Sequence, residues 1–173
     1  MDTASLKTIN YRGGVVRFRV PADWQEEYED AGGGTFYAAG DDTGTLRINV
    51  LTMEAPAGKV VNAGTAAEVL EGESQKYGVP IVPLRDGVAI IRYDLPAEER
   101  GQPLTIRYWR ISQSLAPTSV RIVLFSYTLL KEQWDDPSSQ EDLALIEREI
   151  AAAELAHALG EVPAAKKPWW RLW

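Results

Sequence analysis

Apolar and polar residues alternate in several short segments of the chain, as they do in strands that bury one face. In residues 15–20 and again in residues 46–50, apolar side chains alternate with polar ones that include arginines. Turn residues separate the segments, and Arg85-Asp86-Gly87 contains the Asp-Gly pair that favours a tight hairpin. The pattern predicts strands at residues 15–20, 25–29, 35–38, 46–50, 79–84, 88–95, 104–114 and 119–130.

Two other segments have the spacing of helices. A helix is predicted over residues 65–77, because Thr65 and Glu68 stand at capping-box spacing at its start. A longer helix is predicted from Asp136 and Pro137 to about residue 159, since the aspartate can cap a helix and proline suits its first turn. The stripe of this helix that we expect to face the core contains Leu143, Ile146, Ile150, Ala153 and His157.

The order of these elements predicts an α+β fold, in which a mainly antiparallel β-sheet is flanked by helices, with a long C-terminal helix and an aromatic tail. The strands are joined by hairpin-length links, and only one connection between strand groups is long enough to cross over. A length of 173 residues is typical of one domain. We therefore expect a single α+β domain over residues 1–160 and a Trp-rich C-terminal tail over residues 161–173.

Composition excludes several kinds of chemistry. The chain has no cysteine and one histidine, which rules out disulfides, thiolate catalysis and zinc–thiolate sites. Net charge is −7, and the last eight residues carry three cationic side chains, so residues 1–165 carry −10. That acidic body disfavours nucleic acid and anionic lipid. No export signal or stretch of about 20 apolar residues is present, so we expect a cytoplasmic protein.

No motif in the sequence assigns a catalytic residue, a cofactor-binding residue or a metal ligand. Asp42-Thr43-Gly44 matches the aspartic-protease tripeptide, but it occurs once and has the composition of a turn. The three consecutive glycines at residues 32–34 precede a predicted strand, whereas phosphate loops precede a helix. No Gly-x-Ser-x-Gly motif occurs. Acid–base chemistry by carboxylates alone stays open as an alternative.

Residues Phe18-Arg19-Val20-Pro21-Ala22-Asp23-Trp24, at the exit of the first predicted strand, contain an apolar-Pro-x-x-Trp turn. With the order of elements, this turn resembles the PsbP-like fold family over roughly residues 13–159. The family includes a photosystem subunit, a nuclear GTPase release factor and bacterial envelope proteins. The resemblance implies a non-enzymatic interaction module. The chain departs from the family pattern in its Trp-rich tail and in lacking an export signal.

Seven of the twelve arginines fall on predicted strands, namely Arg17, Arg19, Arg47, Arg92, Arg107, Arg110 and Arg121. Because side chains alternate across a sheet, several of them are expected on one solvent-facing side. One interpretation is ordinary cross-strand pairing with carboxylates. The other is a cationic patch that binds a carboxylate-rich partner through arginine forks, with Arg107 and Arg121 as its contacts.

The tail concentrates residues that dominate protein interfaces, namely Trp169, Trp170, Arg171 and Trp173. The indoles have three alternative locations: a seam of their own domain, a groove on another protein or on a second copy of the chain, and a membrane interface. Eight residues on an acidic body give only marginal membrane attachment. We therefore expect no stable membrane contact, and a homo-oligomer if the tail binds a second copy.

These observations favour a non-catalytic protein-binding module of the accessory, adaptor or immunity type, without a cofactor. It would act through surface complementarity, with the tail, the arginine-bearing sheet face, or both as contact elements. The alternative is an enzyme or a carrier of small anionic ligands, with a carboxylate and arginine pocket between sheet and helix.

Overall fold

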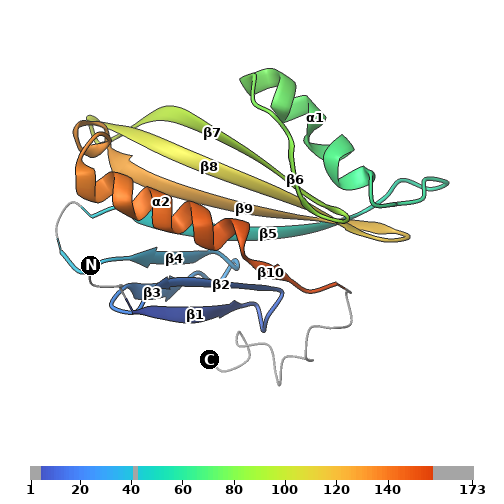
Figure 1. The fold of residues 1–173 in the computed structure, drawn as a ribbon, viewed down its shortest axis with the longest axis horizontal. Helices are drawn as coiled ribbons and strands as arrows, with labels where there is room; N and C mark the ends of the chain where they lie inside the picture. The colour runs from blue at the N-terminus through green and yellow to red at the C-terminus, as the bar shows by residue number, and fades with distance from the viewer. Residues whose placement is uncertain (1–4, 41–42, 158–173) are drawn as a thin grey trace.

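The computed structural model describes residues 5–40 and 43–157. Within this part of the chain, seven strands form one antiparallel sheet in the order β3-β4-β5-β9-β8-β7-β6 (Figure 1). From one edge to the other these are β3 (Gln25–Tyr28), β4 (Gly34–Tyr37), β5 (Thr45–Glu54), β9 (Ser119–Leu130), β8 (Gln102–Leu115), β7 (Val88–Glu99) and β6 (Val82–Arg85).

A second antiparallel sheet has three strands in the order β1-β2-β10, with bounds β1 (Leu6–Tyr11), β2 (Val16–Pro21) and β10 (Glu154–Leu155). We call it the small sheet, and the seven-stranded one the large sheet. Strands β1 and β10 are not among the strands predicted from the sequence. Strand β1 pairs along the whole of β2, and β10 pairs with the opposite edge of β2.

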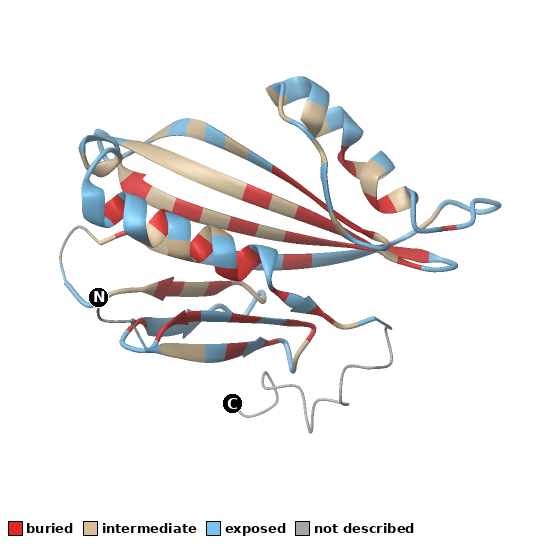
Figure 2. Cartoon of the chain, viewed as in Figure 1, coloured by how far each residue is buried: buried red, intermediate tan, exposed pale blue. Residues whose placement is uncertain are grey.

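Helix α2 (Pro137–Ala151) and the small sheet lie on one face of the large sheet, and α1 (Thr65–Tyr77) lies on the other (Figure 1). Neighbouring residues of β7 show the two faces. Ile90 belongs to the main core with Ile146 of α2, whereas Ile91 packs with Leu70 of α1. Because both faces are covered, residues 119–123 at the start of β9 are all buried, and buried and partly exposed positions alternate only in its second half (Figure 2). This arrangement confirms the predicted α+β fold and mainly antiparallel sheet.

The helix over residues 65–77 is confirmed, but its predicted capping box is not present. Gly64 is the N-cap, and no side-chain oxygen caps the helix. The hydroxyl of Thr65 instead accepts a hydrogen bond from the backbone N–H of Asn62 at 3.1 Å. Asn62 in turn accepts the N–H of Gly64 at 2.8 Å. These turn hydrogen bonds fix the entry to α1.

The prediction that the last helix reaches residue 159 is wrong, because α2 ends at Ala151. A short 3₁₀ turn, η1 (Lys131–Gln133), joins β9 to the segment before this helix. After α2, Leu155 pairs with Val16 of β2, and its side chain enters the main core. The strand pairing and the burial of leucine outweigh the helix propensity of an alanine-rich segment, which is a weak preference. Ala153 is buried, but it and His157 lie beyond the helix.

A hydrogen bond between Tyr127 of β9 and Asp142 of α2 adds a polar link to this packing. Burial raises the pKa of the Asp142 carboxyl, while the hydrogen bond from Tyr127 opposes that shift. Burial also raises the pKa of the Tyr127 hydroxyl. Gly44 is required beside this pair, since a Cβ atom there would lie 1.9 Å from the tyrosine oxygen. This close approach explains why the Asp-Thr-Gly turn contains a glycine, with no need for a catalytic role.

No helix within the described ranges is long and apolar enough to cross a bilayer.

Replacing the leucine of β10 tests the docking of this strand. Leu155→Ala should lower the free energy of unfolding by about 2–5 kcal/mol, since it removes buried methyl groups and leaves a cavity. Glu154→Ala is the matched control, because Glu154 is exposed and its ion pair with Arg17 is also exposed. It should change stability by at most about 1 kcal/mol. Urea denaturation measures both. Equal, small effects would show that β10 does not contribute to the core.

The substitution Asp142→Asn tests whether the buried Asp142 carboxyl makes the free energy of unfolding depend on pH. The pKa of Asp142 is higher in the folded chain than in the unfolded chain, so the folded state binds this proton more tightly. As the pH rises from about 4 to about 7, ionisation of Asp142 should lower the stability of the parent chain. The variant lacks this titration, so its stability relative to the parent should increase over the same range. A difference that does not change with pH would contradict the assignment.

Candidate functional site

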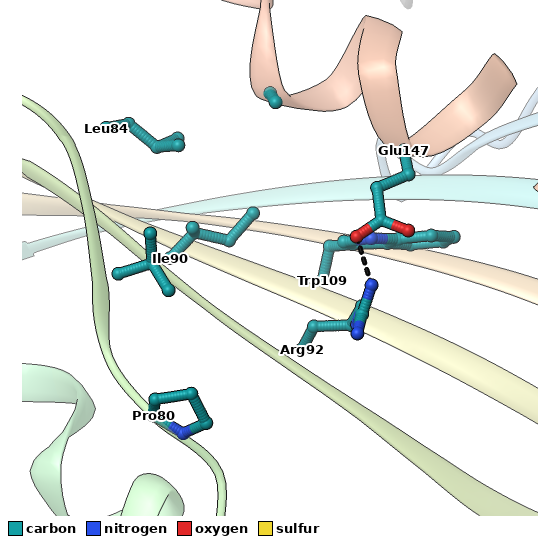
Figure 3. A pocket seen from close by; sticks show the side chains of 8 residues that line it. Pro80, Leu84, Ile90, Arg92, Trp109 and Glu147 are labelled. Atoms are coloured by element: carbon teal, nitrogen blue, oxygen red, sulfur yellow. Dashed lines mark hydrogen bonds and ion pairs between the residues drawn. The ribbon is translucent and has the colours of Figure 1, made fainter. Parts of the chain in front are cut away.

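The candidate site is a cleft between α2 and strands β6, β7 and β8, enclosing about 300 Å³ (Figure 3). Five apolar side chains form most of its wall, and these are Pro80, Val82, Leu84, Ile90 and Ala151. Three larger groups complete it, namely Arg92 of β7, Trp109 of β8 and Glu147 of α2. The cleft is therefore a mainly apolar recess with one ion pair and one indole.

Strand β6 determines one side of the cleft. It is a four-residue edge strand whose pairing with β7 is irregular between Pro83 and Arg85. A proline is tolerated there because an edge strand has a free hydrogen-bonding side. Arg85 donates a hydrogen bond of 2.9 Å to the backbone oxygen of Ala153, just after α2. This contact ties the end of β6 to the exit of the helix beside the cleft.

Arg92 and Glu147 form an ion pair that links β7 to α2 along the cleft (Figure 3). Both side chains are partly exposed to solvent. An exposed pair of this kind contributes only about 0–1 kcal/mol, because water screens it and both side chains lose rotamer freedom. The pair can therefore open at little cost. A ligand that offers a carboxylate could then take the place of Glu147 beside Arg92.

Trp109 contributes a hydrogen-bond donor without an acceptor. Its side chain is 1% exposed, and Nε1 has no hydrogen-bond partner. Buried indole N–H groups usually find one, and leaving such a donor unpaired costs about 1–3 kcal/mol. Figure 3 shows the indole beside the Arg92–Glu147 pair. The cleft thus combines apolar walls, an ion pair that opens easily and an N–H group that lacks an acceptor.

The predicted contacts Arg107 and Arg121 lie on the same face of the large sheet, but they are not neighbours. Arg107 pairs in register with Tyr127, and Arg121 pairs with Gln113. The two arginines are therefore separated by six positions along β8, or about 20 Å. Together they do not make the patch that was expected.

Arg107 is already paired within its own sheet. Its guanidinium donates two hydrogen bonds of 2.8 Å to the carboxylate of Asp94 and lies 5.0 Å from the centre of the Trp134 ring. The hydrogen bonds to Asp94 raise the pKa of Arg107. Binding a second carboxylate there would require Asp94 to be displaced.

Arg121 is 1% exposed, so the prediction that it meets a partner on the surface is wrong. It donates hydrogen bonds to Gln113 Oε1 at 2.9 Å and to the backbone oxygen of Ala156 at 2.5 Å. Burial lowers the pKa of its guanidinium. The side chain serves as a buried tie between the large sheet and the segment after α2.

The seven strand arginines point from three surfaces, so the predicted single cationic face is not formed. Arg17 and Arg19 are on the outer side of the small sheet. On the large sheet, Arg92, Arg107 and Arg121 are on the face that carries α2, and Arg47 and Arg110 are on the face that carries α1. Five of the seven are paired with carboxylates, as Arg17–Glu154, Arg19–Glu149, Arg92–Glu147, Arg107–Asp94 and Arg110–Glu73. The alternative of ordinary pairing with carboxylates describes them better.

The other predicted contacts, Trp169, Trp170, Arg171 and Trp173, lie outside the described residues. In the described part of the chain, no cluster of three or more His, Asp or Glu side chains is arranged to hold a metal ion. The cleft was expected only in general terms, as a carboxylate and arginine pocket between sheet and helix. Its members Trp109 and Glu147 were not identified, because no local motif indicates that a strand tryptophan and a helix glutamate will meet.

Comparison with known proteins shows a shared fold. No protein-family model matches the chain, and no curated protein matches it. A crystal structure from Bacteroides thetaiotaomicron VPI-5482 at 1.50 Å resolution is similar, with a TM-score of 0.59 and 18% identity, over 87% of this chain and 48% of that one. The chain thus spans about half the length of that protein. LpqN, involved in cell envelope biogenesis of Mycobacterium tuberculosis, is similar with a TM-score of 0.54 and 15% identity, over 85% of this chain and 83% of LpqN.

Proposed function

We propose that the chain is a non-catalytic protein-binding module of the accessory, adaptor or immunity type, which receives an apolar group of its partner in the cleft between α2 and strands β6–β8. The observation that carries this proposal is the buried N–H of Trp109 without an acceptor. On binding, the Arg92–Glu147 pair beside the indole opens, and a hydrogen-bond acceptor of the partner reaches this buried group and removes the cost of leaving it unpaired.

The walls of the cleft provide the larger share of the affinity. Val82 is 46% exposed at its mouth, and Leu84 and Ile90 lie further inside. Covering one apolar side chain of a partner contributes about 1.5–3 kcal/mol. Specificity comes from the polar groups, since only a partner with an acceptor near its apolar group also pairs with Trp109. The partner is another protein, or a second copy of this chain.

A second candidate is a carrier of small anionic ligands, and the observation that favours it is Arg92 within the cleft. A volume of about 300 Å³ is at the lower end of the range for small-molecule sites. In this candidate the carboxylate of the ligand replaces Glu147 beside Arg92, while its apolar part lies against the walls.

The relatives in fold are compatible with binding. The proposed relation to the PsbP-like family implies partners rather than catalysis. LpqN is involved in cell envelope biogenesis. The cell envelope is therefore a location to test for this chain, alongside the proposed cytoplasmic location. Neither relation identifies the partner, because one fold supports many functions.

Photo-crosslinking in the cells that produce the protein tests the proposal. Benzoylphenylalanine at Val82 should capture a discrete protein, whereas the same group at Tyr28, exposed on β3, should not. Adding Trp109→Phe keeps an aromatic ring but removes the N–H, and should reduce capture about five- to tenfold.

Three other results would count against this proposal. Equal capture at Val82 and Tyr28 would show that the cleft is not the contact. Capture that Trp109→Phe leaves unchanged would remove the role of the N–H group. A small acidic molecule that copurifies with the chain, and is lost in Arg92→Gln, would favour the carrier instead.

A further inference from the structure

A second apolar depression lies on the opposite face of the large sheet from the cleft. It encloses about 400 Å³ between α1 and the segment that follows β5. Val61, Val69 and Val120 form its floor, where they pack together as a small core of their own. Met53 and Val60 form its rim. We call this depression the α1 groove.

Exposed apolar side chains are concentrated at the α1 groove. Among the described residues, five large apolar side chains are exposed, and three of them are at this end, namely Leu51, Met53 and Val60. Val60 is the most exposed of the five, at 73%. Leu51 and Met53 are two positions apart on β5 and therefore point to the same face. An exposed apolar patch beside a groove is typical of a binding surface.

The charges at the α1 groove favour a cationic occupant. Glu54 and Glu68 line it, together with a single cation, Lys59. A segment that carries both aromatic rings and positive charge therefore fits the groove better than an acidic one.

The described chain ends close to this groove. The backbone oxygen of Ala156 accepts hydrogen bonds from Gln113 and Arg121, which face each other near the end of the β8–β9 hairpin. The turn of the same hairpin holds the edge of the groove, because Pro117 O accepts the N–H of Val61 at 2.9 Å. One hairpin therefore contacts both the last described residues and the groove.

The remaining chain is long enough to pass around this hairpin. Trp169 is twelve residues beyond His157, and an extended chain of that length spans about 40 Å. From Arg121 to the hairpin turn the distance is only about 10 Å, or three strand residues. The tail can thus reach the opposite face of the sheet without displacing any described element.

We infer that the α1 groove is the docking site of the chain's own C-terminal segment, residues 166–173. The three indoles of this segment cover the exposed apolar rim, and its three cationic side chains lie opposite Glu54 and Glu68. The pairing is intramolecular. It does not depend on the cleft, so either proposal can fail while the other holds.

The absence of cysteine allows a direct test on the full chain. A nitroxide at Gly72→Cys, one turn of α1 beyond Glu68 and with open space for a side chain, leaves the groove intact. It should broaden the indole N–H resonances of Trp169, Trp170 and Trp173 in a ¹⁵N-labelled sample, reducing their intensity at least twofold. Single tryptophan-to-phenylalanine variants assign these resonances. A nitroxide at Gln25→Cys on β3 is the control, where Trp24 should broaden instead of the tail. Unchanged tail resonances with the label at residue 72 would overturn the inference.

Substitution at the groove gives a second, independent readout. Val60→Lys adds charge at an exposed position, so the fold should persist, and the tail resonances should recover at least half of the lost intensity. Val82→Lys, at the mouth of the cleft on the other face, is the matched control and should leave the broadening unchanged. Equal effects of the two substitutions would contradict docking in the α1 groove.

Mixing experiments separate one chain from two. Intramolecular docking predicts that broadening persists when the labelled chain is diluted tenfold with unlabelled chain. Broadening that appears only when ¹⁵N-labelled chain is mixed with spin-labelled ¹⁴N chain would show that the tail binds a second copy. That outcome would overturn the intramolecular assignment.

Discussion

The contact of Phe18 with Phe36 and Phe125 is the interaction on which the rest of the structure depends. Phe18 of the small sheet meets both rings of the large sheet edge-on, with centroids 5.4 and 5.1 Å apart and planes at 90° and 83°. Edge-to-face pairs of this kind are favourable beyond the area they bury. The contact sets the spacing of the two sheets. It also leaves Arg19 pointing outward, where it holds the buried carboxylate of Glu149 on α2.

The lengths of the elements explain why binding surfaces remain on both faces of the large sheet. Helix α2 has 15 residues and is about 22 Å long, whereas β8 has 14 residues and is about 48 Å long. Helix α1 is shorter still, at about 20 Å. Neither helix can cover the face on which it packs. On one face the uncovered region is the cleft at Trp109, and on the other it is the α1 groove.

Elements that depend on a repeating local pattern could be predicted from the sequence, and those that depend on a distant partner could not. Strand β9 has the bounds expected from its apolar composition, and α1 has the bounds expected from its composition and turn signals. Strand β10 has two residues, and its conformation depends on the edge of β2 with which it pairs and on the burial of Leu155 in the main core. The burial of Arg121 has the same kind of cause. Alternation placed it on one face of β9 but could not show that the chain after α2 covers that face.

Native-state hydrogen exchange of the backbone amides is the most direct test of the claim that Phe18 joins the two sheets into one rigid unit bearing both surfaces. Amides of β2 and amides of β9 should exchange through the same global opening, with equal free energies. If the amides of β2 instead open at a free energy lower by more than about 2 kcal/mol, the small sheet is a separate unit. That result would contradict the role of Phe18 in joining the two sheets.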